Sequence, residues 1–291
     1  MYKRQGVIRA RVPDEPVERN LSWLGRSVAV DISADGKQLL LYEEGSNPER
    51  QEEVFTTYLR PTDGSDATRL GDGRALALSP DGQWALVARA APETHQALLP
   101  VGEGEPRRLP GGGLLYRRAV FFPDGGRILY NADDEEGSVH TYIQDVAGGP
   151  PRQIGKEGMY GTLVSPDGRT VTLLTHEGAA FYSADGEENP RPIRGALEGD
   201  APYRWSSDGK TIYLWALHEE PLALYRLDLT KGRRERWKQL APPDMTGFLR
   251  YGSRIKGPGL SVTPEGRYYA YTYFTDQSRL VLTDAGPDWW K

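Results

Sequence analysis

The sequence lacks cysteine altogether, so the protein has no disulfide bond, no thiol nucleophile and no thiolate metal ligand. It also lacks any apolar run near the length of about 18 residues that a membrane-spanning helix needs. Residues 1–5 include basic side chains, but no apolar stretch follows them, and they do not resemble a signal peptide. We therefore expect no membrane insertion by this chain.

The chain also has fewer basic residues than acidic ones. The formal net charge is −5 and the sequence pI is about 5.6, which argues against a nucleic-acid partner. No segment sustains apolar residues at helical spacing between the glycines and prolines that punctuate the chain, so we expect almost no helix. The 34 glycines and 22 prolines are spread evenly, which indicates frequent turns rather than a linker.

One short turn, an acidic residue followed by glycine, occurs six times. Successive copies are 46, 43, 43, 41 and 57 residues apart. A period in this range indicates a repeat architecture. The copies are Asp35-Gly36, Asp81-Gly82, Asp124-Gly125, Asp167-Gly168, Asp208-Gly209 and Glu265-Gly266. We predict that the six turns are structurally equivalent, with each glycine at positive φ.

Apolar residues flank each turn at fixed offsets. Positions four and six after the acidic residue are apolar in every copy, and residues two apart share one face of a strand. A third apolar position lies three residues before the acidic residue, at Ile32, Leu78, Phe121, Val164, Trp205 and Val262. Each copy is therefore predicted to form a strand, a tight turn and a second strand.

A looser hairpin follows each of these first hairpins. One runs through residues 54–60 and 67–70, another through 139–145 and 152–154, and a third through 222–229 and 235–240. Four short antiparallel strands in each period of about 40–45 residues describe one propeller blade. The predicted fold class is all-β, a β-propeller of four-stranded antiparallel blades with six blades in this chain. The alternative is a fragment of a seven-bladed propeller.

The two ends of the chain differ from the repeats between them. The last repeat has predicted strands at 260–263, 267–274 and 279–283 and lacks a fourth, whereas strands at 7–12 and 17–23 precede the first repeat. The expected organisation is an N-terminal strand pair at 1–26, a six-repeat propeller at 27–284 and a tail at 285–291. The pair either closes the last blade, with 17–23 as the adjoining strand, or is the remnant of a truncated blade.

Two sequence features resemble known families. Residues 79–82 and 165–168 both read Ser-Pro-Asp-Gly and resemble the repeat of TolB-type, WD40-like β-propellers. Residues 21–24, Leu-Ser-Trp-Leu, and 230–235, Thr-Lys-Gly-Arg-Arg-Glu, resemble the C-terminal propeller of bacterial eukaryotic-like serine/threonine kinases. The second resemblance implies a sensor region outside the membrane or a free-standing relative. No kinase motif accompanies it, so kinase activity is not implied.

Two further functions stay open at this point. A TolB-type propeller also precedes the hydrolase domain of prolyl oligopeptidases, where it gates the substrate, but a Gly-x-Ser-x-Gly nucleophile motif is absent and Ser253 lacks its second glycine. The third reading is a TolB-like scaffold that binds periplasmic lipoproteins. The compartment is periplasmic or extracytoplasmic if the chain is attached to a membrane kinase, and otherwise cytoplasmic.

No residue pattern predicts catalysis, a metal site or a cofactor. The histidines His95, His140, His176 and His218 do not pair at metal-ligand spacing. The acidic run at 133–136 could offer oxygen ligands to Ca²⁺, but without alternating ligands it is interpreted as a solvated hairpin loop. We predict a protein that is not an enzyme.

Cations and tyrosines recur in the loops that lead into the first strand of each repeat. In propellers these loops surround one opening of the central channel, so their side chains are expected to converge there. The predicted ligand-binding residues are Arg26, Arg74, Tyr116, Arg117, Arg118, Tyr160, Tyr203, Arg254 and Lys256, and Arg204 lies beside them. The predicted ligand is a protein or a small anion, the alternative being scattered surface arginines. A monomer is expected.

Overall fold

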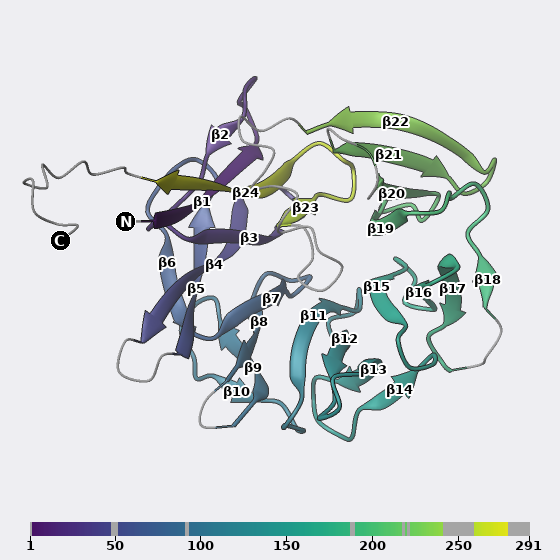
Figure 1. The fold of residues 1–291 in the computed structure, drawn as a ribbon, viewed down its shortest axis with the longest axis horizontal. Coiled ribbons are helices and arrows are strands. Elements are labelled where there is room, and N and C mark those ends of the chain that lie inside the picture. Colours follow the sequence, from purple (N-terminus) through teal and green to yellow (C-terminus); the bar gives the residue numbers. More distant parts are fainter. Residues whose placement is uncertain are drawn as a thin grey trace, which may run out of the picture.

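The structure is a computed structural model that describes residues 2–47, 52–90, 93–186, 190–216, 219, 222–240 and 259–278. These residues form a ring of six four-stranded antiparallel sheets around a central axis (Figure 1). Two cavities along this axis form the central channel. The prediction of a six-bladed all-β propeller is therefore confirmed, and the seven-bladed alternative is wrong. The described residues include no helix, and so none that is long and apolar enough to cross a membrane.

Five blades each come from one continuous stretch of chain, with the strands in sequence order from the channel outward. Blade 1 contains β3 (Ser27–Ile32), β4 (Gln38–Asn47), β5 (Glu52–Pro61) and β6 (Thr68–Asp72). Blade 2 contains β7 (Arg74–Leu78), β8 (Trp84–Arg89), β9 (His95–Pro100) and β10 (Arg107–Arg108). Blade 3 contains β11 (Leu115–Phe121), β12 (Arg127–Asp133), β13 (Val139–Asp145) and β14 (Arg152–Ile154).

The remaining blades complete the ring. Blade 4 contains β15 (Tyr160–Val164), β16 (Thr170–Thr175), β17 (Gly178–Ser183) and β18 (Arg191–Pro192). Blade 5 contains β19 (Asp200–Trp205), β20 (Thr211–Ala216), β21 (Ala223–Asp228) and β22 (Arg233–Gln239). Blade 6 contains β23 (Leu260–Val262) and β24 (Tyr269–Ser278), followed outward by β1 (Tyr2–Arg11) and β2 (Arg19–Asn20).

Blade 6 is composite, because both ends of the chain contribute to it. β1 pairs with β24 over ten residues, from Tyr2 opposite Ser278 to Arg11 opposite Tyr269. From the sequence, we predicted that a C-terminal strand at 279–283 is the third strand of this blade and that 17–23 pairs with it. That was wrong: β1 is the third strand, β2 covers only Arg19–Asn20 on the outside, and 279–283 lies outside the described residues. The ring is therefore closed by the ten-residue pairing of β1 with β24, and β2 adds only a two-residue pairing on the outside of β1.

The acidic-glycine turns are equivalent in backbone geometry. All six glycines have φ between 67° and 74°, which confirms the prediction of positive φ. In blade 2 the Ser79 hydroxyl donates to the Asp81 carboxylate, which also accepts from the Gln83 backbone N–H at 3.0 Å. Blades 1, 4 and 5 repeat this pattern. Side-chain hydrogen bonds to the local backbone fix these turns.

The apolar core is divided among the joints between blades. Five of the six clusters lie between two neighbouring blades, and the cluster between blades 1 and 2 also includes Phe274 of blade 6. Between blades 2 and 3, for example, Leu86 and Leu98 pack against Ile128 and Tyr130, all nearly inaccessible to solvent. Because the core lies between the sheets, the channel edge of each innermost strand is free to carry polar side chains.

Candidate functional site

The channel runs along the six innermost strands and has two ends. We call the end surrounded by the loops that precede these strands the loop side, and the end surrounded by the acidic-glycine turns the turn side. Five innermost strands carry one extra residue opposite their partner strand, namely Val30, Leu76, Arg117, Thr162 and Tyr203. Such bulges break the normal alternation of side chains and re-aim them.

One ring of side chains separates the two ends. Its members lie four residues before the acidic residue of each turn and are Asp31, Ala77, Val120, Leu163, Arg204 and Ser261. Asp31, Val120, Leu163 and Arg204 line the cavities on both sides. We call this set the constriction. It is apolar in blades 2, 3 and 4 and polar in blades 5, 6 and 1.

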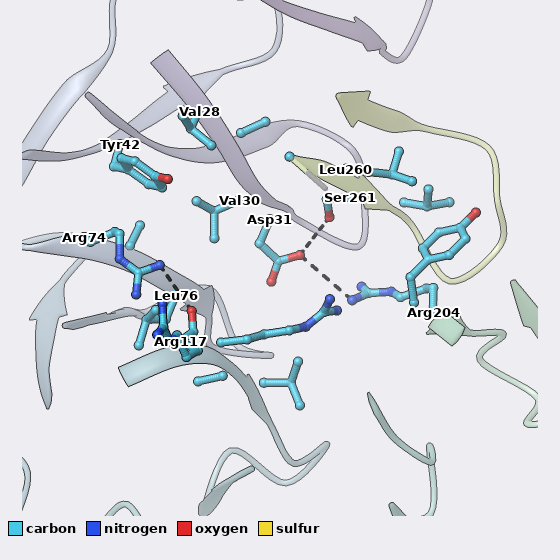
Figure 2. A pocket seen from close by; sticks show the side chains of 18 of the residues that line it. Val28, Val30, Asp31, Tyr42, Arg74, Leu76, Arg117, Arg204, Leu260 and Ser261 are labelled. Atoms are coloured by element: carbon cyan, nitrogen blue, oxygen red, sulfur yellow. Dashed lines mark hydrogen bonds and ion pairs between the residues drawn. The ribbon is translucent and has the colours of Figure 1, made fainter. Parts of the chain in front are cut away.

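Asp31 is the centre of the polar part of the constriction (Figure 2). Its Oδ1 accepts a hydrogen bond from the Ser261 hydroxyl at 3.0 Å, and its Oδ2 accepts one from the Leu78 backbone N–H at 3.3 Å. Nη1 of Arg204 lies 3.9 Å from Asp31 Oδ1, which is an ion-pair contact without a hydrogen bond. Asp31 thus links blades 1, 2, 5 and 6.

Arg118 is a second cation beside this carboxylate. It lines the loop-side cavity, and Asp31, Arg204 and Tyr160 all act electrostatically on its guanidinium. Among the described residues it donates no hydrogen bond and forms no ion pair within 4.0 Å. Burial lowers the pKa of Arg118, because its charged form loses water. Arg118 and Arg204 therefore share one carboxylate, which leaves the constriction with an excess positive charge.

The loop-side cavity is small, with a volume of about 110 Å³. The structure brings Arg74, Arg117, Arg118 and Tyr203 of the predicted set to its lining. Arg74 donates to the backbone carbonyl of Arg117 (Figure 2) and to that of Tyr116. Arg117 forms a forked ion pair with Asp133. The bulge at Arg117 explains how Arg117 and Arg118, although adjacent in sequence, both line this cavity.

The other predicted residues do not line this cavity. Arg26 pairs with Glu44 at 2.9 Å, and Tyr116 is buried in the core with its ring 5.6 Å from that of Tyr130. Tyr160 lies near Arg118 and has its pKa raised by burial. Residues 254 and 256, the predicted Arg254 and Lys256, lie outside the described residues.

The loop-side surface around the cavity exposes leucines. Leu24, Leu115 and Leu197 are 67%, 51% and 59% exposed, and they precede or begin the innermost strands of blades 1, 3 and 5. Buried carboxylates hold two of these loops in place. Glu43 accepts the backbone N–H of Leu24 at 3.1 Å, and Asp200 accepts that of Leu197 at 2.9 Å. Sequence reasoning missed these leucines, because an apolar residue in a repeat is ordinarily assigned to the core.

The turn-side cavity is the larger of the two, with a volume of about 650 Å³. Its wall contains the apolar residues three positions before each turn in blades 1 to 5, namely Ile32, Leu78, Phe121, Val164 and Trp205. Its rim contains the prolines of four turns, Pro80, Pro123, Pro166 and Pro264. The sequence showed both repeats, but we had interpreted them as packing and turn positions and had placed the ligand only at the loop side.

The histidines and the acidic run do not gather at the channel. His95 and His140 contact Glu93 and Asp134 in their own blades, His176 is exposed, and residue 218 lies outside the described residues. Asp134 caps the β12–β13 hairpin by accepting the Ser138 backbone N–H at 2.8 Å. Within the described part of the chain, no cluster of three or more potential metal ligands occurs.

The fold and channel define the class of protein, a six-bladed β-propeller with a polar constriction between two unequal cavities. No protein-family model and no curated protein sequence matches the chain. Among solved structures it is similar to a putative TolB from Agrobacterium tumefaciens, with a TM-score of 0.66, 18% identity, and coverage of 94% of this chain and 99% of that one.

Two partial likenesses extend the comparison. TolB from Acinetobacter baumannii has a TM-score of 0.58 and 18% identity over 84% of this chain and 65% of its own. An acylaminoacyl peptidase from Pyrococcus horikoshii has a TM-score of 0.52 and 14% identity over 72% of this chain and 39% of its own. The chain thus spans about two thirds of that TolB and well under half of the peptidase. At these identities the likeness is one of fold.

Proposed function

We propose that this chain is a non-catalytic interaction propeller that docks an acidic segment of a protein partner at the loop side. The observation that carries the proposal is Arg118, a cation in the channel without a hydrogen-bond or ion-pair partner among the described residues. A half-buried guanidinium with unused donors favours an anionic group more strongly than an arginine in open water does.

The size of the loop-side cavity favours a protein partner over a free small molecule. Its volume of about 110 Å³ is below the range of roughly 300–1,000 Å³ in which small molecules are usually bound. A single carboxylate side chain that projects from a docked surface fits this space. The exposed Leu24, Leu115 and Leu197 supply apolar contacts around the mouth, and the bonds to Glu43 and Asp200 limit the entropy that docking would remove.

The finer role follows the two resemblances. Residues 21–24 and 230–235 support the sensor region of a bacterial signalling kinase or a free-standing relative, which would put an extracellular or periplasmic signal at this face. A likeness of fold over almost the whole chain supports a TolB-like scaffold as the second candidate. No observation on the described residues favours the hydrolase-gating propeller, since its support is a partial likeness of fold.

Charge reversal at Arg118 tests the docking proposal. A fluorescent peptide of alternating glutamate and leucine serves as the acidic probe, and binding is measured by anisotropy at low and high salt. We expect Arg118→Glu to weaken binding by about tenfold or more at low salt, with a smaller difference at high salt, because salt screens the interaction.

The matched control is Arg169→Glu, because Arg169 is exposed on the turn side and its substitution changes the net charge by the same amount. The control should bind like wild type. Equal losses for both variants would show a general charge effect and would contradict docking at the loop side.

A further inference from the structure

The turn-side cavity has the volume of a small-molecule site, whereas the loop-side cavity has room only for a side chain. Its volume of about 650 Å³ lies within the range of roughly 300–1,000 Å³ that is typical of ligand pockets. Phe121 and Val164 are only half-buried, so parts of both side chains are open on the apolar wall. An apolar body of several carbons could cover these surfaces and would gain about 25 cal/mol for each Å² removed from water.

The floor of this cavity carries the polar groups of the constriction. Arg204 and Asp31 both line it, and their only direct contact is the ion pair of 3.9 Å. The guanidinium of Arg204 donates no hydrogen bond to any described residue, whereas both oxygens of Asp31 already accept hydrogen bonds. The donors of Arg204 are therefore available to a ligand, and the carboxylate of Asp31 is largely engaged.

The sign of the charge selects the ligand. Arg118, which lines the loop-side cavity, acts on the same carboxylate from the other side of the constriction, so two cations share one anion there. An anionic head group placed near Arg204 restores the balance, whereas a cationic head group would meet Arg204 and the excess positive charge of the constriction. A carboxylate matches the fork of a guanidinium and can accept two parallel hydrogen bonds from it.

We propose that the turn-side cavity binds a small amphipathic anion, a carboxylate on an apolar body, with Arg204 anchoring the head group and Phe121, Val164 and Trp205 contacting the body. This site lies at the opposite end of the channel from the proposed protein-docking surface and does not depend on it.

The first experiment compares three probes with the same carbon chain, namely octanoate, 1-octanol and octylammonium, by calorimetric titration of the full chain at low salt. Octanoate should bind, 1-octanol should bind at least about tenfold more weakly, and octylammonium should not bind. Absence of octanoate binding, or equal binding of all three probes, would overturn the proposal. The acidic peptide used for the loop side is not involved, so the two proposals can fail separately.

The second experiment assigns the head-group contact. Arg204→Met should weaken octanoate binding by about tenfold or more, and Arg204→Lys, which keeps the charge, should recover part of the loss. Arg169→Met is the matched control, since Arg169 lies on the same side but outside the cavity lining. Thermal unfolding checks that each variant is folded. Equal affinity of Arg204→Met and wild type would overturn the assignment.

The third experiment locates the apolar body. Because Trp205 lines the cavity, octanoate should change the tryptophan fluorescence of wild type, and Trp205→Phe should remove most of that change. Phe121→Ala should weaken octanoate and 1-octanol by similar factors, since it removes apolar contact and no charge. A fluorescence change that persists unaltered in Trp205→Phe would place the probe elsewhere and contradict the proposal.

Discussion

The two ends of the channel share one floor but are constructed differently. On the turn side, the same backbone turn recurs in six blades, and side chains at one repeat position form the wall of a cavity of about 650 Å³. On the loop side, each blade contributes a different loop, and the cavity is about 110 Å³. Arg26 and Arg117 there have carboxylate partners, and Arg74 binds backbone carbonyls.

The difference shows how a repeat fold separates architecture from recognition. Positions that define the turn recur because the backbone needs them, so the turn-side wall is nearly uniform. The loops are free of that requirement, and they differ in charge and in exposed apolar residues. Asp31 lines the cavities at both ends of the channel, so its substitution tests whether the blades that it links depend on it for stability.

Replacing Asp31 should have the largest effect on stability. Asp31→Ala removes the acceptor for the Ser261 hydroxyl and the Leu78 backbone N–H, and it leaves Arg118 and Arg204 without a counter-charge. We expect a loss of about 2–3 kcal/mol in the free energy of unfolding, less than for a fully buried pair because the site is partly open to water. Urea unfolding measures it.

Asp31→Asn provides the control, because it keeps one oxygen acceptor and loses only the charge. It should fall between wild type and Asp31→Ala. If Asp31→Ala is as stable as wild type, the constriction does not couple blades 1, 2, 5 and 6.

Two glycine substitutions compare turns that have the same backbone geometry but different neighbours. Gly36 and Gly82 have φ of 74° and 70°, so alanine meets the same backbone strain at both. A Cβ on Gly36 would lie 2.2 Å from the Tyr268 ring, whereas one on Gly82 would have nothing within 4 Å. Gly82→Ala should cost about 1 kcal/mol and Gly36→Ala about 2 kcal/mol, as measured by urea unfolding. Equal costs would show that Tyr268 moves freely.

Acid should weaken the turn side by a smaller amount. The hydrogen bond from Ser79, followed by that from the Gln83 backbone, lowers the pKa of Asp81 below its usual value. The resulting stability is fully present above the unfolded pKa of about 3.9, and it is lost as the pH falls from there through the lower pKa of the folded state. The gap in melting temperature between wild type and Asp81→Asn should therefore be constant from about pH 5 to pH 7 and should close below about pH 4.

Ser79→Ala is the control for this effect, because it removes the hydroxyl that stabilises the charged form. Its own gap from wild type should narrow over the same acid range. A gap that stays constant below pH 4 in both variants would contradict the hydrogen-bond explanation.

The blade count and most strands could be predicted from the sequence, because turn chemistry and alternation are local properties. The predicted strand at 139–145 is β13 (Val139–Asp145), and the predicted strand at 152–154 is β14 (Arg152–Ile154). The ladder that closes blade 6 could not be predicted in register, since it joins residues more than 250 positions apart in sequence. Local patterns carry no information on which distant edge a strand will prefer.

The candidate site was only partly predictable for a related reason. Sequence offsets bring Arg74, Arg117 and Arg118 to the channel, but they do not say that Arg117 is neutralised by Asp133 while Arg118 is not. That depends on the bulge at Arg117 and on which acids lie across the blade. Alignment of the six repeats four residues before the turn would have revealed Asp31, Arg204 and Ser261 as one ring.

The composite blade has a consequence for synthesis on the ribosome. At roughly 5–20 residues per second, β1 waits on the order of 15–50 s before β24 emerges to pair with it. During that time its edge is open to other strands, including those of neighbouring nascent chains. Its residues include Arg9 and Arg11, which lie two apart on one face of the strand, and these like charges oppose pairing with another copy of itself. The charges of β1 thus reduce its pairing with other nascent chains until β24 has been synthesised.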